Sequence, residues 1–333
     1  MIKIALDTLG GDNSPLVNIE GAVKAVNEIK DLHVFAFGDE MVLKNAFAKY
    51  KYDAERITIV HAPDEISCND KPTDAIRLKK ESSLVKAIEL VKTSDDVNAL
   101  VSIGSTGAVL SGAVLKIGRI QGVKRPALCP VLPTMTDTLV TICDSGANAE
   151  CDVEMLYQFA IMANEYVKKA YGIENPRVAL LNIGAEEEKG DLLRKETYAK
   201  LKENANINFI GNIEGRELLS GVCDVVVCDG FSGNVLLKST EGACIEVMKL
   251  LKKSFTSSLK AKLGALLLKK KVYSIKDKMD YNNYGGAVLL GSKKTVVKGH
   301  GSGNAVSVYN CIKQAYNMEK NNLRESIAEN INL

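Results

Sequence analysis

Short apolar runs rich in valine, isoleucine and leucine alternate along the chain with longer segments of helical periodicity. The apolar runs lie at 2–6, 33–37, 57–61, 97–103, 138–143, 177–183, 207–210 and 224–228. Segments such as 19–29, 82–92, 152–170 and 190–203 carry apolar residues at helical spacing. Nearly continuous apolar strands that alternate with helices are typical of a mostly parallel sheet buried on both faces. We therefore predict an α/β fold over residues 1–333, in one domain with two lobes.

Glycine and small polar residues gather where these apolar runs end. The loops are "DTLGGDNSP" at 7–15, "SIGSTGA" at 102–108, "DSGANAE" at 144–150, "NIGAEEEKGD" at 182–191, "DGFSGN" at 229–234 and "GHGSGNA" at 299–305. In an open parallel sheet, ligands bind outside the carboxyl ends of the strands. The six loops therefore predict one composite small-molecule site.

The first loop has two interpretations from its residues alone. Gly10 and Gly11 permit a close backbone approach, and Asn13 or Ser14 could cap a helix that begins at Pro15. Such a turn either presents N–H groups to an anion or is a capped connection without a ligand. A dinucleotide site is disfavoured, because the GxGxxG pattern is absent.

Two further loops carry candidate phosphate ligands. Ser105 and Thr106 follow a strand end and precede a small-residue helix, where their hydroxyls suit a phosphate or a carbonyl oxygen. The alternative is that the small residues of this segment serve only close packing between helix and sheet. Lys189 follows another strand end, where a cation could meet a phosphate, although "EEEKGD" also reads as a solvated charge run.

The last two loops supply candidates for substrate binding and catalysis. Around the turn at 229–234 these are Asp229, Ser232, Asn234 and, one helical turn later, Lys238. His300 lies between two glycines and has little to pack against, so we expect a functional role for it. No HExxH, GxSxG or carboxylate pair at metal-ligand spacing is present, and we expect neither a metal nor a cofactor.

Residues 246–271 depart from the alternating pattern. Leucines and other apolar residues recur every fourth position, including Leu259, Leu263 and Leu267, and lysines occupy most other faces. We predict a protruding basic amphipathic helix or helical hairpin that forms a dimer contact or lies on an anionic membrane surface. Ordinary packing on the protein body is the alternative.

Composition narrows the class of protein further. The net charge is +2, aromatic residues are 5% of the chain and tryptophan is absent, so a nucleic-acid partner is not expected. The eight cysteines contain no CxxC pair and several lie inside apolar runs, which indicates free thiols in a reducing compartment. The chain opens directly on a strand pattern, and no apolar run reaches transmembrane length. We therefore expect a cytoplasmic protein.

Taken together, the motifs resemble those of a known family. In order they are "LDTLGGD", "VSIGSTGA", "RPALCPVLPT", "DSGANAE", "LLNIGAEEEKG", "FIGNIEGRELLSG", "DVVVCDGFSGNVLLKSTEG", "YGGAVLLG" and "KGHGSGNA". Over nearly the whole chain this series is similar to the PlsX family, the bacterial phosphate acyltransferases of phospholipid synthesis. Ser105 stands where the family commonly has Asn, and Gly303 where it commonly has Ser.

The resemblance implies a specific activity and fold. Such enzymes transfer a fatty acyl group from acyl carrier protein to inorganic phosphate, giving an acyl phosphate for glycerol-3-phosphate acylation. The fold is three-layer α/β/α with a mostly parallel, doubly wound sheet, related to phosphotransacetylases and to isocitrate/isopropylmalate dehydrogenases. The enzymes are homodimers and associate peripherally with the membrane, where the membrane-bound glycerol-3-phosphate acyltransferase is a further expected partner.

The chemistry of phosphate attack on a thioester suggests roles for the candidate residues. We expect Gly10, Gly11, Ser105, Thr106 and Lys189 to hold phosphate, and Asp229, Ser232 and Lys238 to contact substrate. Donors to the thioester oxygen would be Asn148, Asn234 or His300, and His300 could also protonate the leaving thiolate. Three other classes stay open: a short-chain phosphotransacetylase that uses coenzyme A, a metal-dependent decarboxylating dehydrogenase, and a non-catalytic membrane-surface protein.

Overall fold

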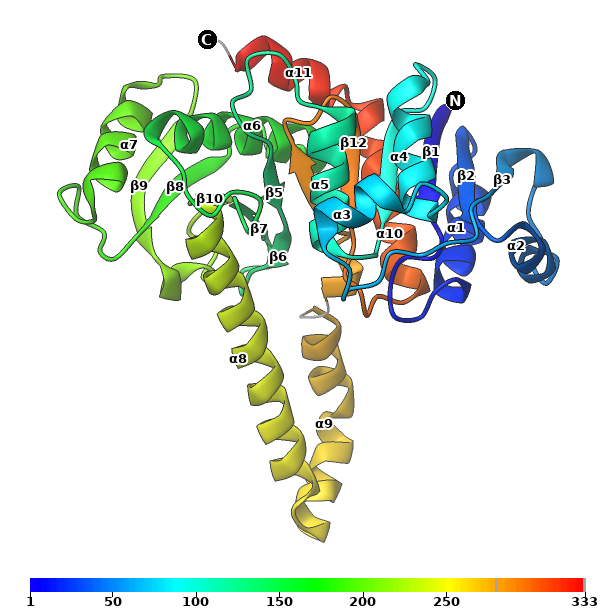
Figure 1. The fold of residues 1–333 in the computed structure, drawn as a ribbon. Coiled ribbons are helices and arrows are strands. Elements are labelled where there is room, and N and C mark those ends of the chain that lie inside the picture. The colour runs from blue at the N-terminus through cyan, green and yellow to red at the C-terminus, as the bar shows by residue number, and fades with distance from the viewer. Residues whose placement is uncertain (279–280, 332–333) are drawn as a thin grey trace.

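Two β-sheets form the body of the molecule, and a helical hairpin projects from it (Figure 1). The computed structural model describes residues 1–278 and 281–331. The first sheet has the strand order β3-β2-β1-β4-β12-β11-β5. Its strands are β1 (Ile2–Asp7), β2 (Leu32–Gly38), β3 (Ile57–His61), β4 (Ala99–Ser102), β5 (Ala127–Cys129), β11 (Ala287–Leu290) and β12 (Thr295–Lys298). The second sheet has the order β6-β7-β10-β8-β9, with β6 (Val131–Pro133), β7 (Leu139–Cys143), β8 (Arg177–Asn182), β9 (Asn208–Glu214) and β10 (Val225–Val227).

Most neighbouring strands run parallel, as the apolar pattern predicts. The exceptions are β11, which is antiparallel to β12 and to β5, and β6, which is antiparallel to β7. The predicted α/β fold class is confirmed, although two sheets take the place of the single sheet that we expected. The chain passes from one sheet to the other at Pro130, between β5 and β6. Proline has no N–H to donate, which suits a point where one strand ladder ends and another begins.

Helices cover both faces of the first sheet, which makes three layers (Figure 1). Ile4 and Leu6 of β1 pack in one core cluster with α1 (Leu16–Glu28) and α10 (Ala305–Lys320). Ala5 points to the opposite face, because side chains alternate along a strand, and joins α3 (Pro72–Leu78), α4 (Ser83–Thr93) and α5 (Thr106–Gly112). The remaining elements of this lobe are α2 (Glu40–Phe47), α11 (Leu323–Asn330), a π-helical turn (Ala113–Ile117) and 3₁₀ turns at Ala54–Arg56 and Tyr281–Asn283.

A single long helix joins the two lobes through a shared core. Phe159, Met162 and Tyr166 of α6 (Val153–Tyr171) are fully buried. They belong to one apolar cluster with strands of both sheets. The lobes are therefore packed on a common core rather than joined by an open linker. The second lobe also holds α7 (Leu192–Glu203) and a 3₁₀ turn at Gly215–Glu217.

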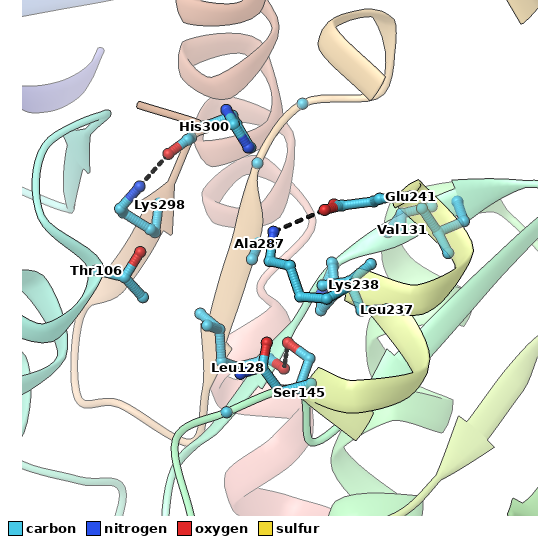
Figure 2. Close-up of a pocket in the computed structure, with 17 residues that line it drawn as sticks. Thr106, Leu128, Val131, Ser145, Leu237, Lys238, Glu241, Ala287, Lys298 and His300 are labelled. Atoms are coloured by element: carbon cyan, nitrogen blue, oxygen red, sulfur yellow. Dashed lines mark hydrogen bonds and ion pairs between the residues drawn. The ribbon is translucent and has the colours of Figure 1, made fainter. Parts of the chain in front are cut away.

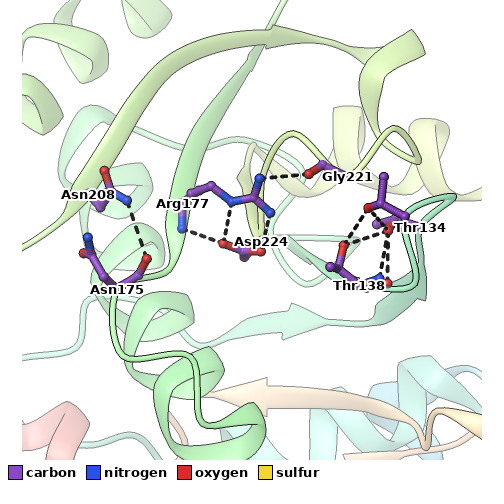
Figure 3. A network of polar contacts seen from close by, with 8 residues as sticks. Thr134, Thr138, Asn175, Arg177, Asn208, Gly221 and Asp224 are labelled. Carbon is purple, nitrogen blue, oxygen red and sulfur yellow. Dashed lines mark hydrogen bonds and ion pairs between the residues drawn. The ribbon is translucent and has the colours of Figure 1, made fainter.

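A partly buried ion pair fixes two strands of the second lobe (Figure 3). The guanidinium of Arg177 donates to both carboxylate oxygens of Asp224, at 3.0 Å and 2.8 Å, and to the carbonyl of Gly221 at 2.9 Å. The backbone N–H of Arg177 also donates to Asp224 at 2.7 Å. Because Arg177 begins β8 and Asp224 directly precedes β10, the pair sets the register where these neighbouring strands start.

The projecting hairpin consists of α8 (Gly230–Thr256) and α9 (Leu259–Lys278) (Figure 1). Asp229 caps the first turn of α8, where its side chain accepts from the N–H of Ser232. Leu259, Leu263 and Leu267 are 85%, 63% and 82% exposed. Within the described residues, no helix is long and apolar enough to span a membrane.

Candidate functional site

A cavity of about 340 Å³ lies between the lobes, beside the base of the hairpin. Figure 2 shows Lys298, Thr106 and His300 on one wall and Leu237, Lys238 and Glu241 on the opposite wall. Four of the six predicted loops contribute to it, through Thr106, through Ser145 and Gly146, through Asn234, and through Gly299 and His300. The prediction of a composite site at the strand ends thus corresponds to a real hollow in the structure.

Lys298, which ends β12, is the most buried cation of this cavity. Its residue is only 7% exposed, and its ammonium donates to the backbone carbonyl of Gly299. Burial lowers the pKa of Lys298 to about 8, and the nearby Lys238 pushes it in the same direction. Lys298 was not among the residues predicted from the sequence. The only available signal was a lysine at the carboxyl end of the short run "TVVK", directly before a candidate loop.

His300 stands two residues after Lys298 and lines the same wall. Its Nδ1 is 2.9 Å from the Ser302 hydroxyl and accepts from the Ser302 backbone N–H at 3.3 Å. Burial and the charge of Lys238 hold the pKa of His300 below its usual value. An imidazole that is neutral and accepts at Nδ1 carries its hydrogen on Nε2. His300 can therefore act as a hydrogen-bond donor at neutral pH.

The opposite wall comes from the first turns of α8. Asn234, Leu237, Lys238 and Glu241 share one face of this helix, because they recur at intervals of three and four residues. The Lys238 ammonium lies 2.6 Å from a carboxylate oxygen of Glu241, so these two charges compensate each other.

The remaining lining is apolar. It is supplied by the crossing between the sheets and by the start of β11, namely Leu128, Pro130, Val131, Leu132 and Ala287. Leu128, Val131 and Leu132 are buried, at 6%, 6% and 8% exposure. The cavity thus offers the cation of Lys298 on one wall and hydrocarbon on another, an arrangement suited to an amphipathic ligand.

Asp144 organises the loop that supplies Ser145 and Gly146. Its carboxylate accepts from the backbone N–H groups of Leu128, Gly146, Ala147 and Asn148 at 2.7–3.1 Å. The Asn148 amide donates to Asp144 and to the Pro126 carbonyl, at 2.9 Å and 2.8 Å. Asn148 is not among the residues that line the cavity, so in this structure its amide serves the loop.

The first of the predicted loops, residues 7–15, lies behind the cavity wall. The backbone N–H of Asp12 donates to the Gly301 carbonyl at 2.8 Å, which ties this loop to the one that carries His300. A Cβ atom on Gly10 would come within 2.6 Å of Asp7 and 2.7 Å of the Gly104 nitrogen, so close approach of two loops requires glycine there. Neither Gly10 nor Gly11 lines the cavity.

Four other candidates also lie outside the cavity lining. Asp229 and Ser232 contact the guanidinium of Arg194, which bridges the cap of α8 to α7. Lys189 is exposed in its loop, and Ser105 precedes α5 without a side-chain cap bond. The structure therefore brings Thr106, Asn234, Lys238 and His300 together and leaves the other predicted ligands apart from them.

The described residues contain no group of three or more His, Cys, Asp or Glu side chains arranged to hold a metal ion. Each of the eight cysteines, all within the described part of the chain, is a free thiol. Burial raises the pKa values of Cys129, Cys143 and Cys228, so these thiols stay protonated.

Comparison with known proteins gives full-length matches. A family profile described as "Fatty acid synthesis protein" matches residues 2–326. A phosphate acyltransferase of Caldanaerobacter subterraneus is 45% identical over 332 residues, which are 100% of this chain and 98% of that protein. A phosphate acyltransferase of Clostridium perfringens is 47% identical over 330 residues, 99% of this chain and 97% of that protein.

Solved structures with a similar fold are more distant in sequence. A phosphotransacetylase from Streptococcus pyogenes aligns with a TM-score of 0.60 at 17% identity, covering 96% of this chain and 94% of that one. A branched-chain phosphotransacylase from Enterococcus faecalis aligns with a TM-score of 0.58 at 17% identity, covering 95% and 98%. At such identities the likeness concerns the fold alone.

Proposed function

This chain belongs to the phosphate acyltransferase family, and we propose that it transfers a fatty acyl group from acyl carrier protein to inorganic phosphate. The product is an acyl phosphate, which serves phospholipid synthesis as an acyl donor. No metal or other cofactor takes part in this proposal.

The observation that carries the proposal is the two-sided character of the cavity. Lys298 and His300 offer a cation and a neutral donor on one wall, which suits phosphate and the polar thioester group. Leu128, Val131 and Leu237 offer hydrocarbon surface, which suits the acyl chain. An acyl phosphate combines both features in one molecule.

The reaction needs positioning more than covalent participation by the protein. A phosphate oxygen attacks the thioester carbonyl carbon, the carbon–sulfur bond breaks, and the sulfur leaves as a thiolate that takes up one proton. Holding both reactants in one cavity supplies a large part of the acceleration. No acyl-enzyme intermediate is required, because phosphate is itself the nucleophile.

His300 and Asn234 are our candidates for stabilising the oxyanion that forms during this attack. Both line the cavity, and the tautomer that the Nδ1 contacts of His300 favour carries a hydrogen on Nε2. A lowered pKa makes His300 a weaker candidate for the acid that protonates the thiolate. Thr106 completes the polar wall through its hydroxyl.

The hairpin supports the part of the proposal that concerns partners. Residues 246–271 carry eight lysines and one glutamate beside exposed leucines. Each lysine near an anionic surface adds about 1 kcal/mol of attraction. We propose that the hairpin holds a homodimeric enzyme at the membrane surface, where the membrane-bound glycerol-3-phosphate acyltransferase consumes the product.

The decisive experiment measures release of free acyl carrier protein from a long-chain acyl-acyl carrier protein, with and without phosphate. We expect release that depends on phosphate and on the enzyme, with an equal amount of acyl phosphate formed. The fold likeness to phosphotransacetylases favours a second candidate, a short-chain enzyme that uses coenzyme A. A parallel assay with short-chain coenzyme A thioesters separates the two, since a preference for those donors would overturn the first proposal.

A further inference from the structure

We propose that Lys298 is the residue that binds the phosphate nucleophile in the cavity between the lobes. This inference rests on the proposed function, because it assigns a residue to one substrate of that reaction. The expectation drawn from the sequence did not include Lys298, because it placed phosphate on Gly10, Gly11, Ser105, Thr106 and Lys189.

The buried ammonium of Lys298 has no salt-bridge partner among the described residues. Within residues 1–278 and 281–331, Lys298 takes part in no salt bridge, and its ammonium reaches the Gly299 carbonyl. Among the residues that the structure describes, Glu241 alone brings a carboxylate to the cavity lining, and it is already paired with Lys238 at 2.6 Å. Burying a charge without a partner is costly, so a ligand anion is the partner that this position calls for.

The groups that face Lys298 from neighbouring elements do not supply that anion. Asp7 of β1 acts on Lys298 without forming a salt bridge within the described residues, because its carboxyl oxygens accept hydrogen bonds from Ser83 and Ser102. Cys311 of α10 is a buried thiol whose pKa is raised to about 12, so it is neutral. The other nearby groups are the thiol of Cys68, which precedes α3, and the cation of Lys238 on α8.

The hydrogen-bond donors around Lys298 also indicate which kind of anion fits this position. An ammonium has three N–H donors, and the contact with Gly299 uses one of them, which leaves two for a ligand. The Thr106 hydroxyl and His300 line the same wall, so several donors converge on one compact region. A tetrahedral oxyanion accepts hydrogen bonds from several directions at once. The apolar part of the lining, which includes Leu128 and Val131, is then left for the acyl chain.

Proton uptake should accompany phosphate binding. Without an anion, burial lowers the pKa of Lys298 to about 8, so part of the population loses its charge as the pH rises toward 9. A bound dianion favours the charged amine and raises this pKa. Binding therefore takes up protons between about pH 8 and 9, and affinity for phosphate falls as the pH rises through this range.

The test is calorimetric titration of inorganic phosphate into the full-length protein without any acyl donor. Lys298→Met removes the charge while keeping much of the side-chain length, and Lys298→Arg keeps the charge. Lys195→Met, at an exposed position of α7 outside the cavity, is the matched control. Titrations at pH 8.5 (about half a unit above the pKa) in two buffers of different ionisation enthalpy report the protons taken up.

We expect Lys298→Met to bind phosphate about 10- to 100-fold more weakly, since charge-assisted hydrogen bonds are lost. Its proton uptake should also disappear, while Lys298→Arg retains part of the affinity and Lys195→Met equals the unaltered protein. Unchanged affinity and unchanged proton uptake in Lys298→Met would overturn the inference, as would a failure of the unaltered protein to bind phosphate. If Lys298→Met does not fold, loss of affinity and of proton uptake in a folded Lys298→Gln gives the same answer.

The two proposals fail in different ways. Because no acyl donor is present, this titration does not depend on which thioester the enzyme uses. Normal phosphate binding together with no release of acyl carrier protein would contradict the proposed donor and leave Lys298 as the phosphate ligand.

Discussion

Asp7 accepts a hydrogen bond from the Ser102 hydroxyl at 2.7 Å, and this bond joins the ends of two neighbouring parallel strands. The Ser83 hydroxyl at the start of α4 donates to the other carboxylate oxygen. Backbone N–H groups of Leu9 and Gly10 donate to the same side chain. One buried carboxyl group therefore holds the opening loop against strand β4, directly behind the cavity wall.

Asp7→Asn should destabilise the protein by about 1–3 kcal/mol, because an NH₂ group then faces hydrogen-bond donors in a buried site. Urea unfolding measures the loss. The variant should also change the pH dependence of stability. Burial raises the pKa of Asp7 in the folded state, so its stabilising contribution is full below the unfolded pKa and is lost as the pH rises through the folded one.

Asp95→Asn, at an exposed position, is the matched control and should leave the urea midpoint unchanged. A midpoint for Asp7→Asn equal to that of the unaltered protein would show that the carboxyl group does not hold the loop.

His300→Ala should lower kcat on the order of 10²-fold, since it removes a donor to the developing oxyanion. The measurement is the initial rate of acyl-phosphate formation at saturating substrate. His61→Ala is the control, because His61 accepts from the Glu40 backbone N–H at 3.2 Å outside the cavity.

The pH profile separates two roles for His300. A neutral donor leaves the His300-dependent part of kcat constant as the pH rises from about 7 to 8, because burial holds the pKa of His300 below its usual value. A general acid would instead lose activity as the pH rises through that range. An unchanged kcat in His300→Ala removes the residue from the chemistry altogether.

Val131→Phe should reduce the use of long acyl chains more than that of short ones. Val131 is buried in the apolar wall of a cavity of about 340 Å³, so the phenyl ring of the variant would occupy space that a long acyl chain needs. We expect kcat/KM for a long-chain donor to fall at least about 10-fold relative to a short-chain donor. Val222→Phe, outside the cavity, should leave the ratio unchanged, and an equal ratio in Val131→Phe would place the chain elsewhere.

Leu259→Glu combined with Leu263→Glu should abolish binding to anionic vesicles, measured by sedimentation. The two leucines are exposed on the hairpin, and two carboxylates oppose both the hydrophobic and the electrostatic attraction. Leu78→Glu, exposed on α3 away from the hairpin, is the control. A double variant that still sediments with vesicles shows that the hairpin is not the anchor. The dimer state must be measured in parallel, because the same face could join two subunits.

The strands that the sequence revealed most clearly are those with long apolar runs. β1, β2, β3, β7 and β8 follow the predicted runs closely, because burial on both faces demands continuous hydrocarbon. β5, β6, β11 and β12 have only three or four residues each and were not predicted, whereas the equally short β4 and β10 lie inside the longer apolar runs at 97–103 and 224–228. The four strands that were not predicted supply Lys298 and most of the apolar residues that line the cavity. The sequence pattern therefore did not reveal the elements that matter most for the cavity.

The sequence predicted which loops form the candidate site better than it predicted which residues line it. Thr106, Asn234, Lys238 and His300 meet in one cavity as expected. Sequence alone does not reveal that Asn148 is held by Asp144, or that Asp229 pairs with Arg194, because these partners lie 4 and 35 residues away and reach their positions only through folding. The same polar residue types serve loop structure and ligand binding, and only spatial placement separates them.

The uninterrupted course of α8 has a mechanical consequence. Its 27 residues extend about 40 Å at 1.5 Å per residue, from the cavity wall to the tip of the hairpin. Asn234 and Lys238 are thus carried on the same rod as the tip, with no hinge between them within that helix. A tilt of the hairpin tip would therefore move Asn234 and Lys238 relative to the opposite cavity wall, which carries Lys298. The width of the cavity would change with the orientation of the hairpin.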